Sequence, residues 1–540
     1  MWGSLRDRRR ARRLLAAGVM ACALASCRAP QAPPPEGTPR LVVLIVVDQM
    51  RADFLDRFDR FWTGGLRYLL DEGVRFTAAH HDHAITATAP GHATLATGCH
   101  PSRHGVFSNY WIDRESGEVV YSAGDDAGEV SVERLECATL GDWLAERYPG
   151  ARVFSLSGKD RSAVLMGGRA ADGVFFYDDE DGSWESAGYS YRKEPEWVAR
   201  FNDQRLLDRH FGTAWELLPA APEELEAVGI VSYDLGPLEP DPPIAFGGLS
   251  PAPGSSFYEE IFASPWLDEH LARFAEHVIG AEALGGDEVP DLLALGFSAT
   301  DAVGHAYGPD SPQLLDTLRR LDATLGQLFD LLDRRIGLDH VVLALSADHG
   351  SVPVPELQRA RGLEGRRADT ADVLCMQRVY ERLQGRFGAG AWLLPGPFVN
   401  REAVAAAGRE VEEVERAAAE LMAGCPAVAH VWTRTELTAP ATAADPMGRL
   451  FVHSFPPERG PDLLVENGEF FLSTRTVASS HGTAWPYDTH VPLVIAAPGL
   501  PGGLRGERVR TVDLAPTLAA LLAVEPVGEI DGVELDLAPR

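Results

Sequence analysis

Positive charge is scarce in this sequence. Its 540 residues contain 49 Lys and Arg against 79 Asp and Glu, which gives a formal net charge of -30. Because nucleic-acid-binding surfaces need clustered Lys and Arg, this composition argues against a nucleic-acid partner. An acidic surface also repels anionic ligands at long range, so an anion has to be held by local attraction from metal ions or a few buried cations.

The N-terminal segment lacks a hydrophobic run long enough to span a bilayer comfortably. The first 27 residues instead combine a basic stretch, a short apolar run and the sequence LASC, which is the order of an export signal and is similar to a bacterial lipobox. We therefore expect a lipoprotein-type signal peptide over residues 1–27, a lipidated Cys27 as membrane tether, and a stiff Pro-rich linker over residues 28–39. The expected location is the periplasm or the cell surface. An ordinary cleaved signal and twin-arginine export remain alternatives.

Cysteines are few, and those beyond the signal segment are widely separated. The four that remain are Cys99, Cys137, Cys375 and Cys425. Their spacing excludes a compact CxxC metal knuckle, and in an oxidising compartment it allows one or two disulfides whose pairing the sequence leaves open. The apolar fraction of 45% and the charged fraction of 24% are those of a folded globular protein.

Continuous β-branched and apolar runs predict strands buried on both faces of a parallel sheet. They lie at residues 41–47, 153–156, 291–297, 341–345 and 491–496. Helical patterns lie between them, notably at 312–335 and 515–523, so we predict an α/β fold with a doubly wound, mostly parallel central sheet flanked by helices. The core is expected over residues 40–169, 288–351 and 476–540. Residues 170–287 are expected to form an insertion, and residues 352–475 a second insertion that caps the active-site edge.

Carboxylates and imidazoles gather where the predicted strands end, at the edge where open α/β sheets bind ligands. These residues are Asp48, Asp301, His305, Asp348, His349 and His481. Such a set suits a pair of zinc ions. Asp301 and His305 are four residues apart, so one helical turn would point both side chains the same way. Taken singly, each residue could equally be a helix cap or a turn residue.

Two further polar groups need an interpretation. Lys159 and Arg161 are two apart, so on an extended segment both would point into one pocket, where they would favour a phosphate monoester dianion over a diester. The alternative is a solvated loop. The run at residues 80–83, with three histidines and Asp82, is interpreted as a polar loop with packed imidazoles outside the metal shell.

The motifs together resemble the alkaline phosphatase superfamily, most closely the bacterial periplasmic phosphate-irrepressible alkaline phosphatases that use a threonine nucleophile. In chain order they are VVDQMR (46–51), TATAPGHATLATG (86–98), SNYW (108–111), SGKDRSA (157–163), SATDAVGHAYGP (298–309), SADHGS (346–351) and SSHGT (479–483).

The resemblance implies a site with two Zn²⁺ ions. Asp301, His305 and His481 look like the ligands of one ion. Asp48, Asp348, His349 and the nucleophile Thr88 look like those of the other. A threonine hydroxyl is a weak nucleophile until metal coordination lowers its pKa. Asn109, with Lys159 and Arg161, is expected to contact the phosphoryl oxygens.

The implied function is hydrolysis of small phosphate monoesters, with broad specificity, through a phosphothreonine intermediate in a monomeric lipoprotein. A phosphodiesterase or nucleotide pyrophosphatase of the same superfamily and a non-catalytic binding lipoprotein are the alternatives. The sequence CHPSR at 99–103 also fits a sulfatase pattern, but Thr97 and Gly98 precede Cys99 instead of following it. We therefore expect Cys99 to be a loop or disulfide residue.

Overall fold

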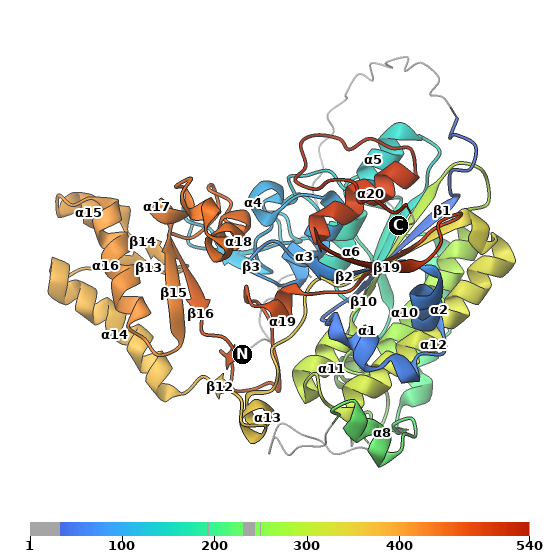
Figure 1. Ribbon diagram of the computed structural model, residues 1–540, viewed down its shortest axis with the longest axis horizontal. Helices are drawn as coiled ribbons and strands as arrows, with labels where there is room; N and C mark the ends of the chain where they lie inside the picture. The colour runs from blue at the N-terminus through green and yellow to red at the C-terminus, as the bar shows by residue number, and fades with distance from the viewer. Residues whose placement is uncertain (1–32, 192–193, 231–243, 249, 539–540) are drawn as a thin grey trace. The chain divides into compact units, whose positions relative to one another are not determined.

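A nine-stranded sheet forms the centre of the computed structural model, which describes residues 33–191, 194–230, 244–248 and 250–538 (Figure 1). From edge to edge, its strands are β19 (Gly503–Arg510), β2 (Val74–His80), β18 (Leu493–Ala496), β11 (Val341–Ser346), β1 (Leu41–Val47), β10 (Asp291–Phe297), β5 (Val153–Ser157), β6 (Gly173–Tyr177) and β7 (Trp184–Ser186). Each of the five predicted strands is present.

Most strands of this sheet run in the same direction. The central strand β1 pairs in parallel with β10 on one side and β11 on the other. The register aligns Val47 with Phe297 and Val46 with Ser346, so the carboxyl ends of the three strands lie level. Antiparallel pairing is confined to β18, against β11 and β2, and to β7, against β6. The prediction of a mostly parallel central sheet is confirmed.

The two faces of the sheet are buried in separate hydrophobic clusters. Along β1, Val43 and Ile45 belong to one cluster, whereas Val42 and Leu44 belong to the other, as expected when successive side chains point to opposite faces. This double burial explains why the strand reads as a continuous apolar run.

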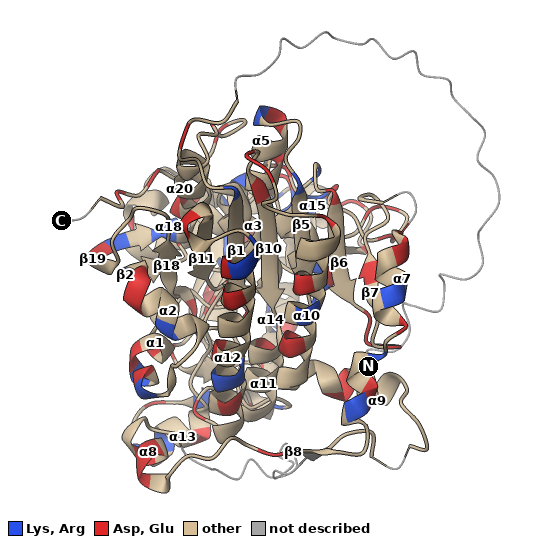
Figure 2. Ribbon diagram, turned by 90° about the vertical axis from the view of Figure 1, so that its right-hand side faces the viewer, with Lys and Arg blue, Asp and Glu red and all other residues tan. Residues whose placement is uncertain are grey.

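Helices cover both faces. The helices α10 (Pro265–Ala281) and α12 (Pro312–Arg335) contribute to the first cluster. Those that contribute to the second are α3 (Thr88–Thr97), α5 (Leu140–Arg147), α6 (Asp160–Gly167) and α20 (Leu514–Leu521). In Figure 2 strands β5 and β6 carry no charged residues, whereas the edge strand β19 and the surrounding helices and loops do.

The segment 170–287, expected as an insertion, also takes part in the core. It supplies β6 and β7 to the sheet, and Leu271 and Phe274 of its helix α10 lie in the first cluster. β6 is buried beside β5, which accounts for its apolar sequence GVFFY. The aromatic and acidic residues that follow it made this strand hard to recognise in the sequence.

The segment 352–475 builds a hydrophobic cluster of its own. Its elements include α13 (Pro355–Ala360), α14 (Thr370–Phe387), α15 (Arg401–Ala406), α16 (Val411–Ala423), α17 (Arg434–Leu437), α18 (Pro446–Ser454) and the antiparallel pair β15 (Val428–Thr433) and β16 (Leu463–Asn467). A disulfide between Cys375 on α14 and Cys425, just after α16, lies within this segment.

The predicted signal peptide, the lipidated Cys27 and residues 28–32 of the predicted Pro-rich linker lie outside the described residues. Among the helices that are described, none has both the length and the apolarity needed to cross a membrane.

Candidate metal centre

The carboxyl ends of β1, β10 and β11 bring the predicted acidic residues together. Asp48 directly follows β1, Asp301 lies in the first turn of α11 (Ala299–Tyr307) after β10, and Asp348 and His349 follow β11. Since the three strands are adjacent and level, residues more than 250 positions apart in the chain become neighbours.

Two groups of potential ligands lie within metal-binding reach. In the first, the Nε2 atom of His349 lies 3.5 Å from Asp48 Oδ1 and 3.4 Å from Asp348 Oδ2. In the second, Asp301 Oδ1 lies 3.1 Å from His305 Nε2 and 3.6 Å from His481 Nε2. The predicted ligands other than Thr88 therefore lie together at this edge. The second group of three whose ligand atoms all lie within 4.8 Å of one another consists of Asp301, His349 and His481. His349 borders both, because its ring stacks on that of His481 with 3.5 Å between the centroids.

Each of the three histidines is held in the orientation that a metal ligand needs. The Nδ1 atoms of His305, His349 and His481 lie 2.8, 3.0 and 2.8 Å from the backbone carbonyl oxygens of Ser479, Gly350 and Thr86, respectively. An Nδ1–H that donates to a carbonyl fixes the tautomer and leaves the Nε2 lone pair for a cation. All three Nε2 atoms face the carboxylates.

The site also carries unmatched negative charge. Asp48 Oδ1, Asp348 Oδ2 and His349 Nε2 are buried and find no hydrogen-bond partner among the described residues. Burial, followed by the charges of Asp301 and Asp348, raises the pKa of Asp48 well above its ordinary value. A cluster of buried carboxylates and imidazoles gains stability from divalent cations, so the residues present fit the predicted metal centre.

Lys159 lies between the two ligand groups. Its Nζ atom is 2.5 Å from both Asp48 Oδ2 and Asp301 Oδ2, and the residue is 6% exposed. Although burial acts in the opposite direction, Asp301 and Asp48 raise the pKa of Lys159. The sequence analysis expected this side chain at the phosphoryl oxygens of a substrate. In the structure its ammonium group pairs with the two carboxylates because they are its nearest buried anions.

Arg161 and Asn109 lie on neighbouring segments. Arg161 is in the first turn of α6, and its buried Nε atom has no hydrogen-bond partner within the described part of the chain. Asp160, which directly precedes Arg161, accepts a hydrogen bond from the Tyr121 hydroxyl. The Oδ1 atom of Asn109 accepts a 2.8 Å hydrogen bond from the backbone N–H of Ala89. Asn109 therefore contacts the helix that begins with Thr88.

Thr88 is the first residue of α3 and is 1% exposed. Its helix approaches the metal centre closely, because a Cβ atom at Gly91 would lie 2.2 Å from the backbone oxygen of Asp348. Only glycine allows this approach. The other hydroxyls of the motif have structural partners, since Thr86 donates to the carbonyl of Thr483 and Thr97 to that of Ala93.

His92 is a site residue that the sequence analysis missed. It is fully buried on α3, and its Nδ1 atom lies 2.9 Å from the carbonyl oxygen of Thr88 and 3.2 Å from Asp348 Oδ2. The available signal was its spacing, four residues after Thr88, which places both on one helix face. His92 connects the first turn of α3 to the metal centre.

Gln49 is a second missed residue and connects the two ligand groups. Its backbone N–H donates to Asp348 Oδ1 (3.1 Å), and its side-chain Nε2 donates to Asp301 Oδ1 (2.6 Å). Gln49 has a φ of +66°, a left-handed conformation that is uncommon for a residue with a side chain. Such local strain is typical of functional sites.

We expect Gln49→Gly to separate backbone strain from site function. Glycine adopts a positive φ freely, so the variant should fold at least as stably as the wild type. Loss of the hydrogen bond to Asp301 should weaken metal affinity or activity by roughly 10- to 100-fold. Thermal unfolding and metal titration measure the two effects. A variant with unchanged metal affinity and activity would contradict the assigned role.

The cysteine and histidine motifs near Thr88 have other roles. Cys99 forms a disulfide with Cys137, in agreement with the expected loop or disulfide residue and not with a sulfatase nucleophile. His81 lies 2.9 Å from both the carbonyl oxygen of Ala347 and the hydroxyl of Thr511, so its ring nitrogens are occupied by structural contacts. Asp82, in contrast, joins a different cluster.

Comparison with known proteins identifies the family. The family model described as type I phosphodiesterase / nucleotide pyrophosphatase matches residues 42–482. The chain belongs to this family. The assignment confirms the resemblance to the alkaline phosphatase superfamily, and the matched range contains every site residue named above.

Relatives of nearly the same length carry the name alkaline phosphatase. Alkaline phosphatase PhoD of Zymomonas mobilis is 32% identical over 93% of this chain and 88% of its own length. Alkaline phosphatase PhoK of a Sphingomonas species is 32% identical over 92% and 91%. A crystal structure of wild-type alkaline phosphatase PafA superposes with a TM-score of 0.80 at 26% identity, covering 92% of this chain and 98% of that one.

Proposed function

We propose that the protein is a zinc-dependent phosphate monoester hydrolase, an alkaline phosphatase, that acts through a phosphothreonine on Thr88. The observation that supports it best is the convergence of two ligand groups, around His349 and Asp301, beside the first turn of α3. Relatives named alkaline phosphatases over almost the whole chain agree with this activity.

In the proposed reaction the residues of the chain bind, orient and attack the phosphoryl group. Asp48, Asp348 and His349 would hold one Zn²⁺ ion, and Asp301, His305 and His481 the other. Bound zinc supplies Lewis acidity and favours an ionised hydroxyl at neutral pH. Thr88 Oγ forms the new bond to phosphorus while the bond to the leaving alcohol breaks. Water then hydrolyses the phosphothreonine and regenerates the hydroxyl.

The contacts of α3 orient the nucleophile. Thr88 is at the N-terminus of a helix, where the dipole favours negative charge on an alkoxide or a phosphate. His92 fixes the Thr88 carbonyl, and Asn109 uses its Oδ1 to bind the Ala89 N–H, which leaves the Asn109 amide N–H groups to donate to a phosphoryl oxygen. The unpartnered Nε of Arg161 is a further donor for the same oxygens.

Arg161 distinguishes a monoesterase from the phosphodiesterase alternative. A monoester dianion carries more charge on its non-bridging oxygens than a diester does, so Arg161→Ala should reduce kcat/KM for an aryl phosphate roughly 10- to 100-fold and affect a bis-aryl phosphate less. Arg416→Ala, on the exposed face of α16, is the matched control.

The assay panel consists of an aryl phosphate, a bis-aryl phosphate and an aryl sulfate, with metal content measured alongside. Preference for the monoester in the wild type supports the proposal. Faster hydrolysis of the diester, with equal losses for both substrates in Arg161→Ala, would favour the phosphodiesterase. The absence of turnover of all three by the metal-loaded protein would favour a non-catalytic binding lipoprotein. We also propose that the enzyme is monomeric and tethered to the membrane through Cys27.

A further inference from the structure

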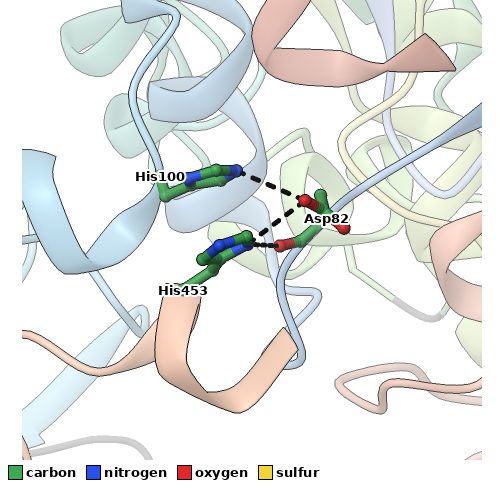
Figure 3. Close-up of side chains that lie close together, drawn as sticks. All are labelled: Asp82, His100 and His453. Atoms are coloured by element: carbon green, nitrogen blue, oxygen red, sulfur yellow. Dashed lines mark hydrogen bonds and ion pairs between the residues drawn. The ribbon is translucent and has the colours of Figure 1, made fainter. Parts of the chain in front are cut away.

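A second cluster of metal-ligand side chains lies outside the proposed active centre (Figure 3). Asp82 follows β2, His100 is the N-cap residue of α4 (Pro101–His104), and His453 lies in the last turn of α18. One ligand atom from each residue can be chosen so that all three lie within 4.8 Å of one another. The cluster thus joins three segments that are far apart in the sequence.

The distances within the cluster match those between the ligands of one metal ion. Asp82 Oδ2 lies 3.2 Å from His453 Nδ1 and 3.8 Å from His100 Nε2. In a tetrahedral zinc site the bonds from the metal to oxygen and nitrogen are about 2.0–2.2 Å long. Two ligand atoms of such a site therefore lie about 3.3 Å apart. The two imidazole rings lie almost parallel, with 3.8 Å between their centroids. The Nδ1 atom of His453 also lies 2.7 Å from the backbone carbonyl oxygen of Asp82. Binding of a common ion therefore requires both rings to turn and His453 Nδ1 to exchange this contact for the metal.

His100 cannot satisfy both ring nitrogens with the surrounding carboxylates. Its Nδ1 atom lies 3.5 Å from Asp531 Oδ2, and its Nε2 atom lies beyond hydrogen-bond distance of Asp82. A neutral imidazole has one N–H and one lone pair, so either tautomer directs a lone pair at a carboxylate. Because the ring is buried, its neutral form is favoured.

Asp531 determines which lone pair is left over. It accepts the backbone N–H of His100 (2.8 Å) and pairs with Arg103 (3.1 Å), so its position is fixed from two sides. An Nδ1–H directed at Asp531 leaves the Nε2 lone pair of His100 facing Asp82. This Nε2 atom is buried and has no hydrogen-bond partner in the region that the structure describes, and His100 is 4% exposed. A carboxylate behind a metal-facing imidazole is the usual support of a histidine ligand.

We infer that Asp82, His100 and His453 bind an additional divalent metal ion of the zinc class. Two imidazole nitrogens and a carboxylate oxygen are donors that zinc prefers, and the 21% exposure of the His453 side chain gives a water molecule access to a fourth position. The ion fixes α18, which belongs to the segment 352–475, to the two connections that flank α3. Asp82 precedes Thr88 by six residues, so the ion stabilises the segment that carries the nucleophile.

Metal counting tests this site independently of the phosphatase proposal. The demetallated protein is reloaded with Zn²⁺, freed of excess metal by gel filtration and analysed for zinc per chain. The wild type should retain one equivalent more than His453→Gln and one more than Asp82→Asn. His430→Gln, an exposed histidine of β15 in the same segment, is the matched control and should equal the wild type. The measured quantity is the difference of one zinc ion between the wild type and a variant. It does not depend on how many ions the active centre binds, because the active centre is the same in both.

A crystallographic measurement on the wild type tests the same site without any variant, so it still applies if a variant fails to fold. Anomalous scattering at the zinc edge from the reloaded wild type should show a peak bounded by Asp82, His100 and His453. Equal zinc content in the wild type and folded His453→Gln would overturn the inference, as would a wild-type crystal with zinc at the active centre and no peak here. The variant His481→Gln removes a ligand of the proposed active centre only. In its crystals the anomalous peak at Asp82, His100 and His453 should remain.

Discussion

Alanine in place of Thr88 should lower kcat for an aryl phosphate by roughly 10³- to 10⁶-fold, which is the range found when a catalytic nucleophile is removed. Thr88 Oγ is the only atom of the chain that forms a bond to phosphorus in the proposed reaction. Zinc content should stay at the wild-type level, because the carboxylates and imidazoles of the centre remain. Steady-state kinetics and metal analysis of the same preparation measure the two effects.

Two control variants make this result specific. Thr88→Ser keeps a hydroxyl at the same position and should keep substantial activity. Thr97→Ala removes another buried hydroxyl of α3. This hydroxyl donates to the carbonyl of Ala93 and accepts from the backbone N–H of Cys99, so its loss should affect stability more than kcat. Near-normal activity in Thr88→Ala would remove Thr88 from its proposed role and leave the metal centre without a nucleophile from the chain.

Removal of metal should have an effect of similar size. Dialysis against a chelator is expected to reduce monoesterase activity to the level of Thr88→Ala, and added Zn²⁺ should restore it. The reason is the group of buried carboxylates, in which Asp48 Oδ1 and Asp348 Oδ2 accept no hydrogen bond from the described residues and have only imidazole nitrogens beside them. Activity assays and metal analysis before and after reloading follow the process.

The pH dependence of chelation provides a further check. Burial and neighbouring carboxylates raise the pKa of Asp48, so protons compete with the metal for this ligand as the pH falls. The chelator should therefore remove metal more readily at low pH than at high pH. Circular dichroism on the stripped protein shows whether the fold survives. Full activity in a folded protein shown to be metal-free would exclude the proposed centre.

The sequence by itself determined the five middle strands of the sheet and the location of the candidate site. A strand buried on both faces must be apolar throughout, so LVVLIVV at 41–47 was recognisable without neighbours. The carboxyl ends of parallel strands meet at one edge, so Asp48, Asp301 and Asp348 could be placed together before their distances were known. The motif around Thr88 pointed to the helix that carries the proposed nucleophile.

Only the tertiary structure decided which side chains meet across large sequence separations. The contacts of Lys159 with Asp48 and Asp301 and those of Gln49 depend on how the loops meet at the sheet edge. The disulfide pairs depend on how helices and loops of other segments pack together. Local sequence patterns carry no information on such contacts. Whether a side chain is buried or hydrogen-bonded there depends on residues from distant segments of the chain. For the same reason the cluster of Asp82, His100 and His453 could not be predicted from the sequence. Its members come from two loops and from a helix of the segment 352–475.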